Sequence, residues 1–554
     1  MRHARLRTGW SIVAVLVLWG ALVVPYQPGD LQPAALLRLP LEGLVLAGVL
    51  LVLPARARRP AATLAGAALA LMCLLKVLEL GFRLALGRPF DAATDTGYAG
   101  SAVSLLFDSA GTAGAVGALA AGGLAVVGIL VVLPLAALRV ADVAGAHRTA
   151  AAATVAALAT VWAGLAVSGV SAGGGPIASA GDARLAVDQT HRITEGIQDE
   201  RRFDRELAAD PHDAAPAGTM LSGLRGKDVL VVFVESYGRF TLEGPSSSPV
   251  TSVLDQSTRR LRQAGFHARS AFLTSPTIGG TSWLVHSTLQ SGLWIDSERR
   301  YDRLMASRHS TLTSLFGRAG WRTVMMIPSS ERPWPDGKGL YRFDTLYGGG
   351  DLGYTGPRFG YAKVPDQYTL EALHRLELAP DRRRPVMAEV DLVSSHTPWT
   401  PLPRMVPWDE LGNGEIYDGM PGDGEPRAQV WSDRDRLRSA YTTSVVYSLR
   451  SLVGFVLRHG DDDLVLVVLG DHQPNTFVTG QGVSHDVPVS VIARDPSVIG
   501  RIAGWGWQDG LRPGPDAPVW RMDAFRGRFL DAYSAPARGP LPVRPSGSGP
   551  TGRR

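Results

Sequence analysis

Five apolar stretches near the start of the chain limit its fold more than any other feature. They lie at residues 9–26, 36–54, 61–82, 115–137 and 149–170. Each is close to the roughly 20 residues that a helix needs to cross the hydrocarbon core of a bilayer. The first is followed too closely by the second to be a simple cleaved signal peptide. The pattern predicts an N-terminal α-helical transmembrane bundle of five spans over residues 1–170.

Basic residues in the short connections predict how this bundle is oriented. Arginines precede the first span, join the second to the third and join the fourth to the fifth, at Arg2, Arg5, Arg7, Arg56, Arg58, Arg59, Arg139 and Arg148. Because positive charge gathers in cytoplasmic loops, we expect these segments on the cytoplasmic side. Five crossings then place everything after Val170 outside the cytoplasm. The expected location is the cell membrane, with several crossings and an extracytoplasmic C-terminal part.

Composition divides the rest of the chain into three parts. They are a polar linker at 171–225, one large domain at 226–534 and a Pro-, Gly-, Ser- and Arg-rich tail at 535–554 that is expected to be disordered. Within the linker, Ala178-Ser179-Ala180 has the small-x-small form that a signal peptidase can cut, although a flexible linker is the favoured interpretation. The net charge of +5 comes partly from the cytoplasmic-loop arginines, so no nucleic-acid partner is expected.

The third span carries the only cysteine of the chain and two charges. Cys73 lies inside this span, so the exported part has no disulfide and depends on burial, and on any bound metal, for its stability. Lys76 and Glu79 lie in its outer half, with Arg83 four residues further on. Charges inside a membrane are costly unless they are paired or face water. They predict a local ion-pair ladder that reaches the outer interface or, less favoured, a path that admits a lipid headgroup.

Between the linker and the tail, short β-branched runs alternate with longer amphipathic stretches. This alternation predicts an α/β domain with helices on both faces of its sheet. The expected strands are 228–234, 322–327, 385–393, 464–469 and 487–492, and the expected helices are 252–264, 281–291, 310–319, 365–378 and 433–458. Ligands of open α/β sheets bind beyond the carboxyl ends of the strands. Glu235, His396 and the pair Asp471-His472 fall at such ends.

Together with Thr281, these residues suit a metal site that holds an activated nucleophile. Singly, Glu235 could be a loop-capping acid, and Thr281 after two glycines could be a helix N-cap whose hydroxyl accepts a backbone N–H. Asp471-His472 is the stronger pattern, because a carboxylate and an imidazole leaving one strand can bind the same ion. The helix N-terminus at Thr281 would also favour an anion or a phosphoryl group.

The order of the motifs resembles the sulfatase-like branch of the alkaline phosphatase superfamily. The motifs are Glu-Ser-Tyr from 235, Gly-Gly-Thr-Ser from 279, Ser-Ser-His-Thr-Pro-Trp from 394, Gly-Asp-His from 470 and His-Asp-Val-Pro from 485. Within that branch the chain is most similar to the lipoteichoic acid synthase and phosphoglycerol transferase group, with the phosphoethanolamine transferases as cousins. The resemblance implies five spans, a linker that can be cleaved and an extracytoplasmic domain of the alkaline-phosphatase/sulfatase type.

The resemblance also implies roles for individual residues. It implies four ligands of a divalent metal ion, which are Glu235, Thr281, Asp471 and His472. Thr281 would double as the nucleophile, and His396 would contact the transferred phosphate or the leaving group. His485 matches a histidine of the cousins that holds substrate or a further zinc, although a strand-capping surface histidine is an equally good interpretation. The oxygen-rich ligand set suits manganese, magnesium or zinc.

Two departures from the related families bear on which reaction this chain catalyses. The formylglycine sulfatases need a Cys/Ser-x-Pro-x-Arg box, and residues 281–285 have neither the proline nor the arginine. The cousins usually carry several disulfides in their exported domain, whereas this chain has none there.

Candidates for a headgroup pocket are Trp283, Arg332, Trp334, Lys338, Arg342 and Trp399. Asp366 matches an acidic residue that opens a helix in related enzymes, and we interpret it as an N-cap.

The sequence therefore predicts a membrane-anchored, metal-dependent transferase that moves a phosphoryl headgroup similar to phosphoglycerol. The donor would be a phospholipid, the intermediate a phosphodiester on Thr281, and the acceptor an envelope glycolipid or polymer. One alternative is a phosphodiester or sulfate-ester hydrolase of the same superfamily. Another is a non-catalytic envelope-binding protein, which is disfavoured because every expected metal-ligand position holds a competent side chain.

Overall fold

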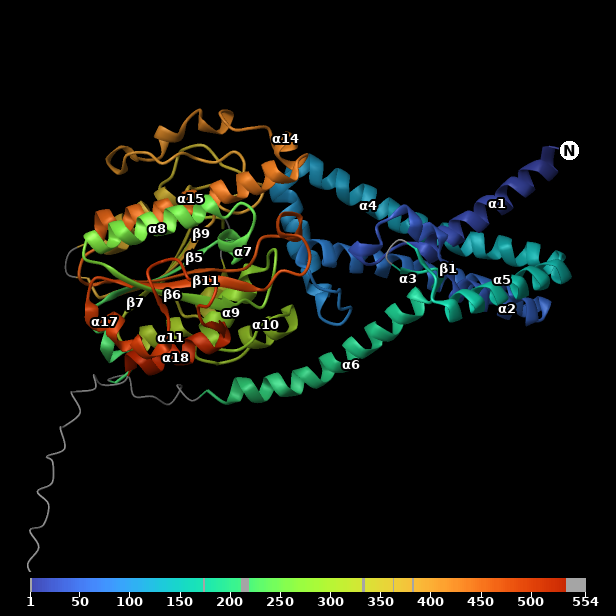
Figure 1. The fold of residues 1–554 in the computed structure, drawn as a ribbon, viewed down its shortest axis with the longest axis horizontal. Helices are drawn as coiled ribbons and strands as arrows, with labels where there is room; N and C mark the ends of the chain where they lie inside the picture. The colour runs from blue at the N-terminus through green and yellow to red at the C-terminus, as the bar shows by residue number, and fades with distance from the viewer. Residues whose placement is uncertain are drawn as a thin grey trace, which may run out of the picture.

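The chain folds into an elongated helical bundle followed by an α/β domain (Figure 1). The computed structural model describes residues 2–172, 175–210, 219–330, 334–361, 363–380 and 383–534. The predicted tail at 535–554 lies outside the described residues.

The apolar stretches of the sequence are all helical. The bundle consists of α1 (Arg2–Val23), α2 (Leu41–Val52), α3 (Ala55–Leu86), α4 (Tyr98–Ala146) and α5 (Arg148–Ser168). Three segments of the described chain are long and apolar enough to cross a membrane, namely Ala55–Leu86, Thr112–Ala146 and Arg148–Ser168. Gly9–Val23 and Leu41–Val52 are apolar but shorter. Three candidate spans are therefore present, and five crossings stay a prediction.

Close packing and one ionic contact hold the bundle together. A Cβ atom on Gly66 of α3 would lie 2.5 Å from the Cα of Pro134 in α4, so the two backbones approach more closely than a larger residue allows. Arg58 donates to the carbonyl oxygen of Leu53, and Arg59 pairs with Asp142 near the end of α4. Arginines from the expected cytoplasmic side thus lie at one end of the bundle.

The charges of the third span have partners outside that span. Lys76 is 1% exposed, pairs with Asp182 and donates to two carbonyl oxygens at the end of α1. Glu79 is fully buried and pairs with Arg83 of its own helix and with Arg192. Asp182 and Arg192 belong to α6 (Gly181–Ala208). The expected ion-pair ladder is therefore part of a wider network that joins α3 to α6.

Helix α6 occupies half of the interval that was predicted to be a linker. It runs from the bundle to the α/β domain (Figure 1). Its second half forms ion pairs with α10 (Glu298–Met305), which are Asp199–Arg300, Glu200–Arg299 and Asp204–Arg303. Ala178 and Ser179, in the potential cleavage sequence, form strand β4, which pairs with Leu39–Pro40. The connection is held at both ends, because charged side chains along α6 meet partners in both parts of the protein.

The α/β domain is built on a nine-stranded sheet with the order β12-β6-β11-β10-β5-β9-β7-β8, in which β13 also pairs with β6. The parallel centre comprises β10 (Leu464–Gly470), β5 (Asp228–Val234), β9 (Val386–Leu392), β7 (Arg322–Ile327) and β8 (Thr345–Gly348). The antiparallel side begins with β11 (Asp486–Ala493) and β6 (His267–Thr274). The short strands β12 (Gln508–Asp509) and β13 (Val519–Arg521) flank β6.

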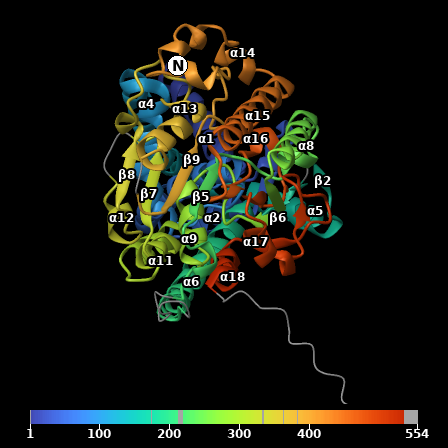
Figure 2. The same ribbon diagram turned by 90° about the vertical axis from the view of Figure 1, so that its left-hand side faces the viewer.

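Helices cover both faces of this sheet (Figures 1 and 2). Alternate residues of β5 enter two separate cores, with Val232 on one side and Val231 on the other. The first core includes residues of α8 (Ser248–Gln263), α13 (Asp366–Leu373) and α15 (Arg434–His459). The second includes residues of α9 (Ser282–Ser291), α11 (Leu312–Arg318) and α18 (Asp523–Ser534). Burial on both faces explains why the central strands are continuous apolar runs.

Every predicted strand and helix of this domain is present, with ends shifted by a few residues. The helix expected at 365–378 is α13 followed by a π-helical turn at His374–Leu378. The interpretation of Asp366 as an N-cap is wrong. Pro365 is the N-cap residue, and the buried Asp366 carboxylate accepts the Ser394 N–H at 2.9 Å and the Ser448 hydroxyl. It therefore joins the loop after β9 to α15.

Candidate metal centre

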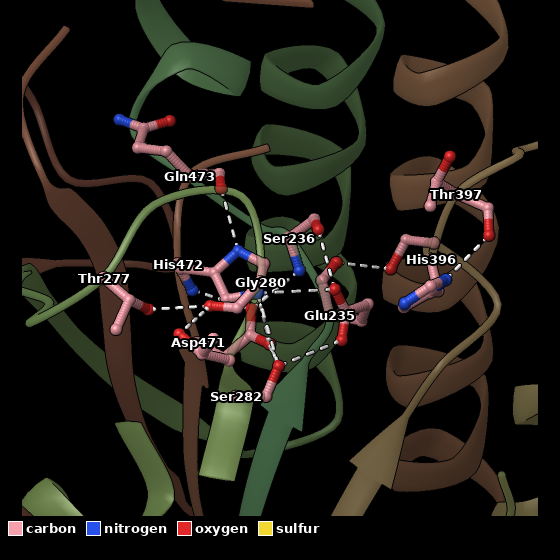
Figure 3. A network of polar contacts seen from close by, with 12 residues as sticks. Glu235, Ser236, Thr277, Gly280, Ser282, His396, Thr397, Asp471, His472 and Gln473 are labelled. Carbon is pink, nitrogen blue, oxygen red and sulfur yellow. Dashed lines mark hydrogen bonds and ion pairs between the residues drawn. The ribbon is translucent and has the colours of Figure 1, made fainter. Parts of the chain in front are cut away.

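Three neighbouring parallel strands bring the predicted site residues to one edge of the sheet. Glu235 follows β5, His396 follows β9 by a short loop, and Asp471-His472 follow β10. Because β10, β5 and β9 are adjacent and parallel, their carboxyl ends lie side by side. The first residue of α9, Ser282, meets them there (Figure 3).

Glu235, Asp471 and His472 form a compact buried cluster. Ligand atoms of the three residues lie within 4.8 Å of one another. The side chain of Glu235 is 11% exposed, and those of Asp471 and His472 are 1% exposed. Burial and the neighbouring Glu235 raise the pKa of Asp471 to about 6. In the described chain, neither carboxylate forms an ion pair with a lysine or an arginine.

This donor set fits a divalent cation. Two buried carboxylates that repel each other need a positive charge nearby, or one of them must take up a proton. Two carboxylates and an imidazole are ligands that zinc accepts, and carboxylates also suit magnesium and manganese. The structure therefore contains a candidate metal-binding group, and the identity of the metal is left open by these ligand types.

Backbone contacts orient the ligands. The Asp471 carboxylate accepts the N–H groups of Ser236 and His472 through one oxygen, each at 2.7 Å. The Nδ1 atom of His472 lies 2.8 Å from the carbonyl oxygen of Gln473. A carbonyl can only accept, so Nδ1 carries the hydrogen, and in the neutral ring the lone pair that faces the carboxylates is on Nε2. This is the tautomer that a metal ligand requires.

Two serine hydroxyls touch this cluster. Ser236 donates to Glu235 Oε1 at 2.8 Å, and Ser282 contacts all three residues. Its Oγ atom lies 2.8 Å from Asp471 Oδ2, 3.3 Å from His472 Nε2 and 3.5 Å from Glu235 Oε2 (Figure 3). The sequence did not lead us to propose Ser282, although it stands beside Thr281 in the same motif.

Thr281 is the N-cap residue of α9, as its position suggested, but its side chain makes no capping bond. Instead, its hydroxyl donates to the carbonyl oxygen of Gly280 at 2.6 Å. Its φ of +63° is unusual for a β-branched residue and stores local strain. The side chain lines the same cavity as Glu235 and Asp471, so Thr281 lies at the site with its hydroxyl bonded to the backbone.

His396 lies beside the cluster as a neutral base. Its Nδ1 atom is 2.7 Å from the carbonyl oxygen of Thr397, and its ring stacks on Tyr361 with the centroids 3.8 Å apart. Burial lowers the pKa of His396 to about 4. The imidazole is therefore uncharged at neutral pH, and its Nε2 atom can accept a proton or a hydrogen bond.

His485 lies just before β11. Its Nδ1 atom is 3.2 Å from the carbonyl oxygen of Ser275. It is not one of the residues that line the cavity at the candidate metal centre.

A second group of titratable residues, which the sequence did not suggest as a site, adjoins the first. His286 lies on α9 one turn after Ser282, and its Nδ1 atom is 2.7 Å from Glu389 and 3.7 Å from Asp391. Burial alone would lower the pKa of His286, but Asp391 and Glu389 raise it to about 9. His286 and Asp391 line the cavity. The only clue in the sequence was the occurrence of two acids inside the apolar strand β9.

A cavity of about 1060 Å³ opens from the cluster toward the helical bundle. Trp283 is one wall, and its indole N–H donates to Glu298 at 3.1 Å. The other described candidates for a headgroup pocket do not line this cavity: Trp334, Lys338, Arg342 and Trp399. Arg332 lies outside the described residues.

Comparisons with known proteins give solved structures only. No protein-family model matches the chain, and no curated protein matches its sequence. The lipoteichoic acid synthase LtaP of Listeria monocytogenes is 14% identical over 61% of this chain and 78% of that chain, with a TM-score of 0.36. The soluble domain of lipooligosaccharide phosphoethanolamine transferase A of Neisseria meningitidis is 14% identical over 56% and 90%, with a TM-score of 0.37.

A third match is the phosphoglycerol transferase GacH of Streptococcus pyogenes in complex with sn-glycerol-1-phosphate. It is 10% identical over 61% of this chain and 90% of that chain, with a TM-score of 0.33. The three proteins come from the groups that the order of motifs resembles. At these TM-scores the matches carry no conclusion about function, which must come from the residues of this chain.

Proposed function

We propose that this protein is a membrane-anchored, metal-dependent transferase. It takes a phosphoryl headgroup similar to phosphoglycerol from a phospholipid and passes it to an envelope glycolipid or polymer. The supporting observation is that hydroxyl-bearing residues at the N-terminus of α9 adjoin an uncompensated pair of buried carboxylates, beside a cavity that reaches the membrane bundle. The catalytic domain lies outside the cytoplasm, and five helices cross the membrane.

Glu235, Asp471, His472 and a hydroxyl of the Thr281-Ser282 pair would hold the cation. When bound, the cation would stabilise negative charge on the phosphoryl oxygens and lower the pKa of a hydroxyl. Helix α9 begins at Ser282, beside the cluster, and the N-terminus of a helix favours an anionic group. Positive charge at this point also removes the repulsion between the two carboxylates.

The reaction is a double displacement at phosphorus. The Thr281 hydroxyl oxygen forms a bond to phosphorus, the bond from phosphorus to the diacylglycerol oxygen breaks, and diacylglycerol leaves with a proton. An acceptor hydroxyl then forms its bond to the same phosphorus, and the bond to Thr281 breaks. In each step the attacking hydroxyl loses a proton and the leaving oxygen gains one. His396 is the candidate proton donor or acceptor for the diacylglycerol and acceptor oxygens, which occupy the side of phosphorus opposite Thr281.

The contact geometry makes Ser282 the competing nucleophile, so the test compares the two hydroxyls. Full-length wild-type, Thr281→Ala and Ser282→Ala proteins are incubated in vesicles with headgroup-labelled phosphatidylglycerol. We expect loss of transfer in both variants. A covalent phosphoglyceryl adduct, detected by mass spectrometry of intact protein, should form in Ser282→Ala but not in Thr281→Ala.

An adduct that persists in Thr281→Ala and disappears in Ser282→Ala would assign the nucleophile to Ser282. Full turnover in the doubly substituted protein would refute covalent catalysis at this helix end. The destination of the label separates the reaction classes. Label in a glycolipid or polymer indicates a transferase, and label released only into water indicates a hydrolase.

A further inference from the structure

The cavity at the candidate metal centre has one wall made by the membrane bundle. Leu78, Gly81, Phe82 and Ala85 of α3 line it, together with residues at the start of α4. The opposite wall contains Glu235 and the residues around Thr281. One continuous space therefore joins the polar cluster to the outer end of a candidate membrane span, Ala55–Leu86.

The last turns of α3 have two chemically different faces. Lys76, Glu79 and Arg83 recur at helical spacing on one face. Glu79 pairs with Arg83, and Lys76 and Glu79 also pair with residues of α6. Leu78 and Phe82, four residues apart, lie on another face and line the cavity. The charged face of α3 therefore contacts other helices, and its apolar face lines the cavity.

The end of α3 also contacts the loop that carries the proposed nucleophile. A Cβ atom on Gly279 would lie 2.4 Å from the carbonyl oxygen of Ala85, and the φ of Gly279 is +77°. Only glycine fits this close approach and this backbone conformation. The hydroxyl of Thr476, the first residue of α16 (Thr476–Thr479), donates to the carbonyl oxygen of Leu84. The position of the apolar wall relative to Thr281 is therefore set by direct contacts.

We propose that this cavity binds the acyl-glycerol part of the phospholipid donor, with one acyl chain lying along Leu78 and Phe82. The inference rests on the proposed function and adds the place where the lipid tail binds. Its chemical basis is that a phospholipid has an anionic headgroup and apolar tails. The cavity has the candidate metal-binding cluster at one end, where a bound cation would attract the headgroup, and apolar side chains of α3 at the other. Val77 and Leu78 are 55% and 46% exposed on a helix that enters the membrane, so the apolar end opens toward lipid.

A substitution at Gly81 can block the apolar end of the cavity without disturbing the packing of the bundle. A Cβ atom added at Gly81 meets no heavy atom within 4 Å, so Gly81→Leu would project into open space in the cavity. Gly164 of α5 is a matched control. It also has open space around it and lies on a candidate span, but it does not line the cavity.

The binding experiment uses the full-length protein in vesicles that contain phosphatidylglycerol with a photoreactive diazirine in the middle of one acyl chain. After illumination, adducts are mapped by mass spectrometry. We expect adducts on the α/β domain, on peptides that contain Trp283 or Tyr361, both of which line the cavity. The yield of these adducts should fall about tenfold in Gly81→Leu and not in Gly164→Leu.

Adducts confined to the outer surface of the bundle, or equal yields in wild type and Gly81→Leu, would overturn the proposal. A second measurement compares transfer from dioleoyl and dibutanoyl phosphatidylglycerol, which share a headgroup. The ratio of their kcat/KM values should fall about tenfold in Gly81→Leu and stay constant in Gly164→Leu. An unchanged ratio in Gly81→Leu also refutes the tail site, even if transfer itself is confirmed.

The two readouts separate this inference from the function on which it rests. Cavity adducts without any headgroup transfer would leave the tail site standing and refute the transferase. Headgroup transfer without cavity adducts would support the transferase and refute the tail site.

Discussion

Two groups of buried charges border the same region of the molecule, and they are balanced in different ways. Where α3 meets α6, Glu79 has Arg83 and Arg192, and Lys76 has Asp182. At the candidate metal centre, the His472 imidazole is the one side chain among the described residues that could form an ion pair with both Glu235 and Asp471. The first group is neutralised by the protein itself. The second has no lysine or arginine partner among the described residues, and a bound cation would neutralise it.

This difference separates structure from chemistry. A buried charge with its own partner fixes the position of two helices, and removing one partner leaves an uncompensated charge. A buried charge without a partner holds the site ready for an ion, and removing it relieves repulsion in the metal-free protein. The same type of substitution should therefore have opposite effects on stability in the two regions.

The largest effect is expected from metal removal or from Asp471→Asn. Either change should lower headgroup transfer by about 10³-fold or more, because a metal supplies several kcal/mol of transition-state stabilisation. In EDTA, Asp471→Asn should nevertheless melt at a higher temperature than wild type. The assays are transfer of labelled phosphatidylglycerol and thermal unfolding. Full activity after chelation would show that the carboxylates of the candidate metal centre do not need a cation, and the proposed difference between the two regions would not hold.

The opposite sign is expected at the membrane-side network. Lys76→Met leaves Asp182 buried without its cation, so the free energy of unfolding should fall by about 3–5 kcal/mol. Thermal unfolding in detergent with and without EDTA measures this change. The charge exchange Lys76→Asp with Asp182→Lys serves as the matched variant and should recover part of the loss. Unchanged stability in Lys76→Met would contradict the structural role.

A smaller effect is expected from the cluster of His286, Glu389 and Asp391, in which the histidine itself supplies the positive charge. His286 has a pKa of about 9, above its ordinary value of 6.5. Protonation of His286 therefore contributes stability that is fully present below pH 6.5 and is lost as the pH rises through about 9. Asp391, whose pKa burial raises to about 7, has lost most of its proton by pH 7.5 and adds little to the change above that pH. Wild type in EDTA should lose about 2 kcal/mol between pH 7.5 and 9.5.

Glu389→Gln tests the cause of this pH dependence. The neutral amide no longer favours the charged imidazole, so the decline in unfolding temperature from pH 7.5 to 9.5 should become shallower. His286→Gln should remove the component altogether. A decline equal to that of wild type in both variants would exclude His286 as its source.

The smallest effect is expected where α6 meets α10. Arg303 pairs with Glu200 and Asp204, and all three side chains are partly exposed to water. Solvent screens such pairs, so Arg303→Ala should change the free energy of unfolding by about 1 kcal/mol or less. If Arg303→Ala lowered the free energy of unfolding as much as Lys76→Met, the ion pairs at the two ends of α6 would contribute equally to stability, contrary to this prediction.

The sequence predicted the fold wherever a local pattern was strong. The continuous apolar runs of β5 and β10 could be assigned because strands buried on both faces need no polar alternation. Strand β6 was missed because His267, Arg269 and Ser270 interrupt its pattern. Helix α6 was missed because its stability comes from ion pairs with Arg299, Arg300 and other partners far away in the chain.

The sequence by itself determined which residues stand at the carboxyl ends of β5, β9 and β10, because strand length and apolar pattern are local properties. It thereby placed Glu235, His396, Asp471 and His472 together. Only the tertiary structure decided that the Ser282 hydroxyl touches this group, that His286 has two carboxylate neighbours, and that the apolar end of α3 borders the site. These facts depend on backbone dihedral angles in one turn and on contacts between segments far apart in the chain, which no local pattern encodes.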